Sequence, residues 1–264
     1  MKRTIIIILV LVLIGIGFYI GYRQTSSYHA AEQTTSLESG VLIPQPDPEI
    51  PQIVSTSPSN GASDVDPALD KFTVTFDRDM LPGYAFTDNS GRKYYPSIPG
   101  KPYWVDKRTC VCPIKLEPES IYRMGLNDGK FQGFKSTTQI PLPAHPIYFT
   151  TQGASADLVQ MLNPPVIIAF DPPNDATDVD PNRTTLSVTF NQNMGSGIAW
   201  VSDGHIPQII GTPMWNAEKR TCTVSVKLEP RREYKIFLNS AKYIGFASEV
   251  GIPSEPIEYT FKTK

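Results

Sequence analysis

The sequence predicts an all-β protein in which two tandem antiparallel β-sandwiches follow one N-terminal transmembrane helix. Three observations predict this fold class: an uncharged apolar run near the N-terminus, a long internal repeat, and alternation of apolar and polar residues inside the repeated segments. The composition is that of a folded protein rich in turns, because 25 Pro and 18 Gly among 264 residues fall below the share typical of low-complexity chains.

The apolar run has the length and the flanks of a membrane anchor. Residues 4–22 carry no charge, Lys2 and Arg3 precede them, and Arg23 follows. As a helix the run would be about 28 Å long, close to the ~30 Å hydrocarbon core of a bilayer. The excess of positive charge before it places the N-terminus in the cytoplasm. We therefore expect residues 1–23 to be a signal anchor, with the membrane as a partner and the C-terminal part extracytoplasmic.

The alternative for this segment is a cleavable signal peptide. The apolar run is longer than the ~7–15 residues of that class, and no good small-x-small cleavage site follows it. An uncleaved anchor is therefore favoured, while cleavage, and the choice between periplasm and cell surface, stay open. Residues 24–50 are rich in Ser, Thr, Gln and Pro and poor in aromatic residues, which predicts a disordered or extended stalk.

One internal repeat, at a spacing near 112 residues, divides the rest of the chain. SPSNGASDVDP at 57–67 matches DPPNDATDVDP at 171–181. Two copies of one domain are therefore predicted, at 51–152 and 165–264. The linker between them, 153–164, contains several large apolar residues, so we expect it to pack against a domain.

Inside each copy the apolar residues recur with a period of two, as half-buried strands require. Phe72, Val74 and Phe76 alternate with Lys and Thr. The pattern Leu-Glu-Pro-x-x-x-Tyr, at 116–122 and 228–234, places a tyrosine at the start of a strand after a turn, where a sandwich has a tyrosine corner. The other alternating positions are Cys110, Cys112, Ile114 and Leu116, Leu186, Val188 and Phe190, and Cys222, Val224, Val226 and Leu228.

These motifs resemble the bacterial Ig-like domains found in S-layer and other surface proteins. The resemblance rests on P-x-N-x-A-x-D-V before a strand, F-x-V-T-F-x-x-x-M, R-T leading into an alternating strand, and L-x-P-x-x-x-Y, and it covers about 200 of the 264 residues. It implies a seven-stranded sandwich used as a spacer or adhesion module on extracytoplasmic proteins. The loops at 128–145 and 240–255 are longer than in many such domains.

Charge and cysteine usage exclude several classes of function. The chain has 24 Lys and Arg against 26 Asp and Glu, so no basic field is present to hold nucleic acid. Cys110 and Cys222 occupy equivalent positions in separate copies, and Cys110 and Cys112 share one strand face, where a disulfide would be strained. All three are expected to be free and buried. No Cys/His spacing suits zinc, and no cofactor motif is present.

Paired aspartates repeat at equivalent positions, as Asp64-Val-Asp66 and Asp178-Val-Asp180. Carboxylates at alternating loop positions can converge on calcium, but Asp beside Asn, Gly and Pro also forms Asx turns. Because no Gly-centred twelve-residue loop closed by Glu is present, we predict no metal site, although calcium binding at these residues stays open.

Aromatic residues give a further candidate surface. Trp104 and Trp215 are equivalent, which predicts a core role in both copies. Tyr94, Tyr95 and Tyr103 lack aromatic equivalents in the second copy. They are expected to be solvated edge-strand side chains, the alternative being a patch that faces a carbohydrate or a protein.

The long loops are the predicted place for binding. Each contains aromatic-x-Gly-Phe, and we expect both rings, Phe131 and Phe134 in the first copy, to tuck under the sandwich as a satellite cluster. Lys130, Gln132 and Lys135 would then form a tip that faces a partner.

The sequence therefore predicts a non-enzymatic, membrane-anchored binding, adhesion or spacer module, with no catalytic residue and no cofactor. Its partner would be another envelope protein or a glycan. The alternative function is a calcium-dependent carbohydrate-binding or weakly hydrolytic surface protein.

Overall fold

The computed structural model of the chain describes residues 49–90, 92–202 and 204–264. The predicted helix at 1–23 and all but the last two residues of the predicted stalk lie outside these ranges. Within them, no helix is both long enough and apolar enough to cross a bilayer.

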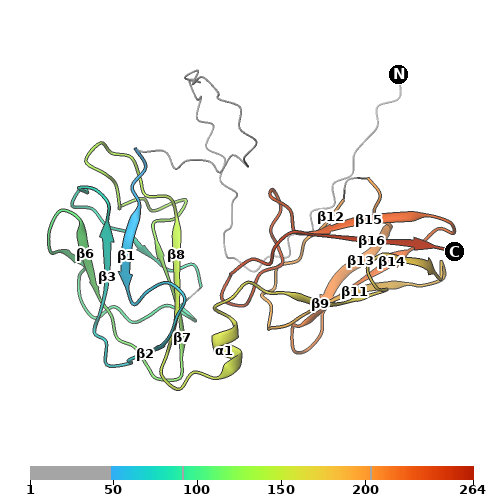
Figure 1. Cartoon of the computed structure of the whole chain (residues 1–264), viewed down its shortest axis with the longest axis horizontal. Helices are drawn as coiled ribbons and strands as arrows, with labels where there is room; N and C mark the ends of the chain where they lie inside the picture. The colour runs from blue at the N-terminus through green and yellow to red at the C-terminus, as the bar shows by residue number, and fades with distance from the viewer. Residues whose placement is uncertain (1–48, 91, 203) are drawn as a thin grey trace, which may run out of the picture. The chain divides into compact units, whose positions relative to one another are not determined.

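The first sandwich contains eight strands in two sheets (Figure 1). One sheet has the order β1-β3-β6-β5 and the other the order β2-β8-β7-β4. The strands are β1 (Ile53–Ser57), β2 (Ala62–Val65), β3 (Lys71–Phe76), β4 (Phe86–Thr87), β5 (Tyr103–Trp104), β6 (Thr109–Pro113), β7 (Ile121–Leu126) and β8 (His145–Thr151).

The second sandwich repeats this order, as β9-β11-β14-β13 and β10-β16-β15-β12. Its edge strand β13 is eight residues long, whereas the equivalent β5 has two. The strands are β9 (Ile167–Asp171), β10 (Ala176–Val179), β11 (Thr185–Phe190), β12 (Trp200–Val201), β13 (Gln208–Trp215), β14 (Thr221–Lys227), β15 (Glu233–Leu238) and β16 (Ile257–Thr263).

The strand order is that of an immunoglobulin-type sandwich, with four strands in the order A-B-E-D on one sheet and C, F and G on the other. The expectation of seven strands is corrected, because the first strand is divided between the two sheets as β1 and β2. The expectation of purely antiparallel sheets is corrected at the same place: β2 pairs parallel with β8, and β10 with β16. After crossing to the other sheet, β2 and β10 each lie beside the last strand of their domain, which runs in the same direction, so the pairing is parallel.

The predicted alternation produces the core of each domain. On β3 the side chains of Phe72, Val74 and Phe76 are buried, while the threonines between them face outward and are partly exposed. Burial of each such side chain stabilises the domain by about 1.5–3 kcal/mol relative to leaving it in water. The equivalent positions Leu186, Val188 and Phe190 on β11 are buried in the same way.

Both predicted tyrosine corners are confirmed. The Glu117 N–H donates to the hydroxyl oxygen of Tyr122 over 2.7 Å, and the Glu229 N–H donates to that of Tyr234 over 2.8 Å. Each bond ties the turn before β7 or β15 to the strand that follows it.

The three cysteines are free and buried, as predicted. Burial raises the pKa of each thiol to about 12. The thiolate, which is the reactive form, is therefore scarce at neutral pH, and these residues behave as small apolar side chains.

The segment between the sandwiches packs against the second one. It contains the helix α1 (Ala156–Gln160), which begins after the N-cap Ser155, and it buries Met161. Asp157 pairs with Arg220 at 3.3 Å. These contacts are of the kind that a packed linker makes, and the linker bounds of 153–164 stay a prediction.

Candidate functional site

A buried asparagine folds each long loop back over its own domain. Asn127, 2% exposed, follows β7 with a positive φ of 57°. Its Oδ1 accepts the Phe134 N–H, and its Nδ2 donates to the carbonyls of Phe134 and Leu142, each over 2.9 Å. Asn239 after β15 repeats this pattern with Phe246 and Ser254. The loop backbone is therefore held by an amide side chain, as a strand is held by its neighbours.

The second ring of each loop joins the main core and not a satellite cluster, which corrects that expectation. Phe134 lies 5.3 Å from Phe76 and 5.2 Å from Phe86, measured between ring centroids. The chain reaches this position through Gly133, where a Cβ atom would lie 2.2 Å from the carbonyl oxygen of Tyr84. Only glycine permits an approach this close.

The first ring of the loop points the other way. Phe131 is 55% exposed, so the expectation that it tucks under the sandwich is wrong. The Asp128 Oδ1 accepts the backbone N–H groups of Lys130 and Phe131, and the Phe131 carbonyl accepts the Asp128 N–H. This small turn presents the Phe131 ring to solvent.

The structure separates the three predicted contact residues of this loop. Lys130 and Gln132 are exposed on either side of Phe131. Lys135 follows the buried Phe134 and is itself half-buried, with its carbonyl accepting the Leu81 N–H. Two of the three residues therefore lie at the tip, and the third lies beyond a core residue.

Phe131 lies at one side of a groove of about 430 Å³ on the first domain. Three segments that are distant in sequence contribute to it. The residues that line the groove are Tyr84, Ala85, Phe86, Thr87, Asp88, Ile98, Pro102, Asp128 and Phe131. Tyr84 is 40% exposed, and its ring lies 6.4 Å from that of the half-buried Phe86. The groove is thus an aromatic surface open to solvent.

Two carboxylates, Asp88 and Asp128, add negative charge to this surface. The Asp88 Oδ1 accepts hydrogen bonds from the N–H and the hydroxyl of Ser90, at 2.8 and 2.7 Å. Within the described ranges, neither carboxylate pairs with a cationic side chain, and neither Oδ2 accepts a hydrogen bond. Sequence reasoning missed Tyr84, Asp88 and Asp128, since no motif marks them and only the folded loops bring them together.

The tyrosines singled out in the sequence do not form one exposed patch. Tyr95 packs against the core, and burial raises its pKa. Tyr103 is exposed at the edge strand β5, as expected of a solvated side chain. Tyr94 lies between these extremes, with the Lys93 Nζ 4.8 Å from its ring centroid. Trp104 and Trp215 both pack against the cores, as predicted.

One aspartate of each pair forms a turn, and the other lies in a strand, Asp64 in β2 and Asp178 in β10. The Asp66 Oδ1 accepts the Ala68 N–H over 2.8 Å, and the Asp180 Oδ1 accepts the Asn182 N–H over 3.0 Å, so each is an Asx turn. In the part of the chain that the structure describes, no three His, Cys, Asp or Glu side chains are grouped so that they could hold a metal ion.

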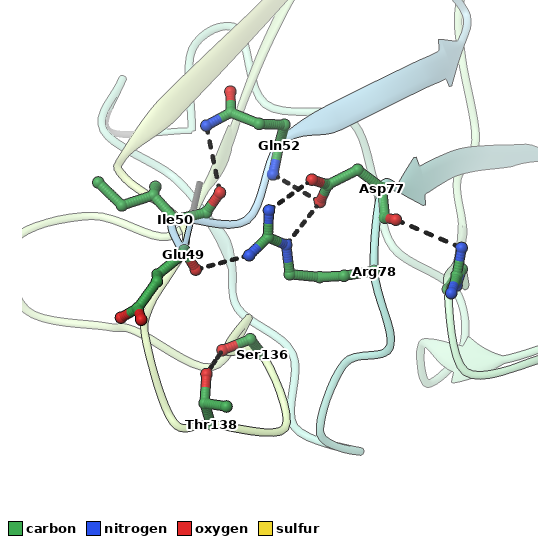
Figure 2. Close-up of polar contacts among 8 residues, drawn as sticks. Glu49, Ile50, Gln52, Asp77, Arg78, Ser136 and Thr138 are labelled. Carbon is green, nitrogen blue, oxygen red and sulfur yellow. Dashed lines mark hydrogen bonds and ion pairs between the residues drawn. The ribbon is translucent and has the colours of Figure 1, made fainter. Parts of the chain in front are cut away.

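A second polar constellation fixes the point at which the chain joins the first domain (Figure 2). Arg78 donates to both carboxylate oxygens of Asp77, at 3.0 and 2.7 Å, and to the Glu49 carbonyl at 2.7 Å. The Gln52 N–H donates to the Asp77 Oδ1 over 2.9 Å. Hydrogen bonding from Arg78 lowers the pKa of Asp77. We call these residues the N-terminal clamp.

The second domain has the same clamp built from neutral side chains. Asn191 and Gln192 stand where the first domain has Asp77 and Arg78. The Asn191 Oδ1 accepts the Val166 N–H over 2.9 Å, and the Gln192 Nε2 donates to the Asn163 carbonyl over 2.9 Å. The clamp therefore has a structural role, because it holds the incoming chain in both domains although its side chains are charged in one and neutral in the other.

Comparison with known proteins gives only distant similarities. No family model matches the sequence, and no curated protein matches it. Similar solved structures include the surface layer protein SbsC, domains 1–6, with 12% identity over 81% of this chain and 26% of that chain, at a TM-score of 0.26. The D00–D0 domain of intimin has 8% identity over 78% of this chain and 98% of that one, at 0.24. InvD of Yersinia pseudotuberculosis has 13% identity over 81% of this chain and 57% of that chain, at a TM-score of 0.27.

This chain spans about a quarter of the length of the SbsC structure. With TM-scores this low, the similarities carry no weight for the fold or the function. The immunoglobulin-type assignment rests on the strand order and on the tyrosine corners.

Proposed function

We propose that this chain is a single-pass membrane protein whose extracytoplasmic part is a tandem Ig-like binding module. The groove of the first domain carries this proposal. Binding sites are typically concave and rich in aromatic side chains, with a few polar groups that orient the ligand. Loops held on a rigid sandwich are also where such sites are usually found.

Comparison of the two domains separates residues that the fold requires from residues that are available for binding. The buried asparagine, the core phenylalanine and the tyrosine corner are present in both domains. The groove residues differ. Tyr84, Asp88, Asp128 and Phe131 correspond to Ile198, Ser202, Ser240 and Tyr243. The carboxylates in particular belong to the first domain alone, so they are available for a role that the scaffold does not require.

The anchor and the clamps fit the same function. A helix at residues 4–22 would tether the chain to the membrane, and the stalk would hold the domains away from lipid. The clamps keep the chain on a fixed path where it joins each sandwich. Such a chain presents a binding surface at a distance from the membrane, to another envelope protein or to a glycan.

The test is capture of a partner from envelope extracts by the full-length chain. We expect the wild-type chain to capture a specific partner and the variant with Lys130, Gln132 and Lys135 all changed to Ala to lose it. The matched control is Lys242→Ala, because Lys242 occupies the position of Lys130 in the second domain and likewise lies over a neighbouring ring.

Two results would contradict the proposal in different ways. Unchanged capture by the triple variant would remove the side chains of Lys130, Gln132 and Lys135 from the contact surface. Failure of the wild-type chain to capture any partner would favour a spacer without a binding role.

A further inference from the structure

We propose that the groove of the first domain holds an arginine side chain of a partner protein. This inference rests on the binding function proposed above and names the chemistry of its site. It follows from what the groove offers to a ligand: aromatic faces, hydrogen-bond acceptors and negative charge.

The aromatic faces suit a cation. The exposed rings of Tyr84 and Phe131 and the half-buried ring of Phe86 line the groove. A guanidinium or an ammonium group over such a face is attracted by the quadrupole of the ring. The Phe131 ring already makes one contact of this kind, since the Lys130 Nζ lies 5.4 Å from its centroid.

The polar groups of the groove accept hydrogen bonds. Asp88 and Asp128 use Oδ1 to hold their own turns, and the Oδ2 of each accepts no hydrogen bond from the described residues. The hydroxyl of Thr87 is already used, because it donates to the Asn127 carbonyl. Only the Tyr84 hydroxyl could donate from the remaining side chains of the lining. A ligand that only donates hydrogen bonds fits this set.

Arginine matches the groove better than a sugar or a lysine does. Sugar hydroxyls both donate and accept, so a glycan would find too few donors here. Lysine has a compact, strongly hydrated charge, whereas the guanidinium of arginine is planar, stacks on aromatic rings and presents five donors. A guanidinium whose plane lies on one of the rings can still donate to a carboxylate at the edge of the groove.

The groove also has the charge that selects this ligand. Neither of its carboxylates pairs with a cationic side chain of the described residues, so together they give the groove a negative charge that attracts a cation. The expected partner segment is therefore basic, and its binding should weaken as ionic strength rises. The second domain has serines at both positions, so it should not bind the same segment.

The test is an NMR titration of the full-length chain with the peptide acetyl-Gly-Arg-Gly-amide. We expect shifts of the backbone amide signals of Asp128 and Phe131, which lie in the turn beside the groove. The same peptide with citrulline, which keeps the shape of arginine but has no charge, should give no shifts. Asp88→Asn with Asp128→Asn should weaken binding at least about tenfold, which corresponds to ~1.4 kcal/mol.

The asparagine substitutions leave the scaffold in place, because an asparagine Oδ1 can accept the same turn hydrogen bonds. The control is Asp66→Asn, which removes one negative charge from another Asx turn of this domain and should leave binding unchanged. Phe131→Ala should also weaken binding, whereas Phe131→Tyr, which keeps an aromatic ring, should bind as the wild type does.

Three results would overturn the inference: equal binding of the citrulline peptide, undiminished binding by the double variant, or shifts caused by a neutral chito-oligosaccharide in place of the arginine peptide. Each of these leaves the binding function standing if a partner is still captured. Absence of any captured partner would instead count against the binding function itself.

Discussion

At the scale of single residues, one buried amide per domain decides the shape of the loop. The Asn127 side chain makes hydrogen bonds to one N–H and two carbonyls of the loop. A buried backbone group without a hydrogen-bond partner lowers the stability of the fold by about 1–3 kcal/mol. The Asn127 side chain therefore supplies hydrogen bonds that a neighbouring strand would otherwise make. Its positive φ also suits asparagine better than most residues.

Asn127→Ala is expected to destabilise the first domain by about 2 kcal/mol or more, because the Phe134 N–H and the Leu142 carbonyl lose their hydrogen bonds to Asn127, whereas the Phe134 carbonyl keeps the Leu142 N–H. The measurement is denaturant-induced unfolding of the full-length chain, analysed as two domain transitions. Asn89→Ala, at an exposed position of the same domain, should change stability by no more than about 0.5 kcal/mol. Equal stability of the Asn127 and Asn89 variants would show that water replaces the amide at little cost.

Cys222 is expected to resist alkylation in the folded chain and to react after unfolding. Burial raises its pKa to about 12, so the thiolate forms only well above neutral pH. Mass spectrometry after iodoacetamide treatment, with and without denaturant, measures the difference. Cys222→Val should change stability by less than about 1.5 kcal/mol, because it is an apolar exchange of similar volume. Rapid labelling of the native chain would contradict the burial of this face of β14.

At the scale of elements, the two N-terminal clamps do the same work with different electrostatics. Asp77 and Arg78 form a charged pair in the first domain, and Asn191 and Gln192 replace them in the second. The charged version couples the attachment of the incoming chain to pH, whereas the neutral version does not.

The clamp of the first domain should loosen in acid. Hydrogen bonding from Arg78 lowers the folded-state pKa of Asp77 below its usual 3.8, so the folded state holds this proton less tightly than the unfolded state does. The resulting stabilisation is present above the unfolded pKa and is lost as pH falls through the folded pKa. Because the pair is partly exposed, we expect a contribution below about 1 kcal/mol.

The matched variant combines Asp77→Asn with Arg78→Gln, which gives the first clamp the residues of the second. The free energy of unfolding of the first domain, measured at about pH 7 and about pH 3, should fall less in this variant than in the wild type. Asp79 and Asp106 also have lowered pKa values and remain in both proteins, so only the difference between the two reports on the clamp. An identical fall in both would show that the clamp pair does not contribute.

The edge strands show a second difference between equivalent elements. The long edge strand β13 exposes Ile210 and Met214, which could pair with another chain. Its pairing with β14 is interrupted between these residues, where Gly211 has a φ of 74° and Pro213 has no N–H to offer. The interruption therefore protects the long edge strand of the second domain from pairing with another chain. The equivalent strand of the first domain, β5, has only two residues and is too short to need this protection.

At the scale of the whole molecule, one scaffold is used twice with different surfaces. The strand orders and the buried asparagines that hold the long loops are the same in both domains, while Tyr84 and the two groove carboxylates, Asp88 and Asp128, are replaced by Ile198, Ser202 and Ser240 in the second. Under the function proposed above, the first copy carries the binding surface and the second copy supplies length.

The membrane anchor is tested on the intact protein. If residues 1–23 span the membrane, the chain should remain with the membrane fraction after washing with alkaline carbonate, and its first residue should still be Met1 or Lys2. Immunoblotting of the fractions and N-terminal sequencing measure the two outcomes. A soluble form beginning near Glu32 would show instead that the segment is a cleaved signal peptide.

Much of the scaffold could be predicted from the sequence, because it depends on local patterns. Alternation at Phe72, Val74 and Phe76 predicts both the strand and its buried face, since successive side chains of a strand point to opposite sides. The repeat predicts the second domain, and the position of Tyr122 predicts its corner. The division of the first strand between two sheets was not predicted, because it depends on where the chain crosses the core.

The groove, in contrast, was decided by tertiary structure alone. Its residues come from three separate segments, near Tyr84, Ile98 and Asp128, and no spacing in the sequence shows that they meet. The spacing in the sequence also predicted the same position for both rings of the loop. In the structure, Asn127 holds Phe134 in the core, and the turn at Asp128 directs Phe131 outward. Periodicity reports the local geometry of the backbone, but a groove is fixed by contacts between residues far apart in the chain, and these exist only once the loops have folded.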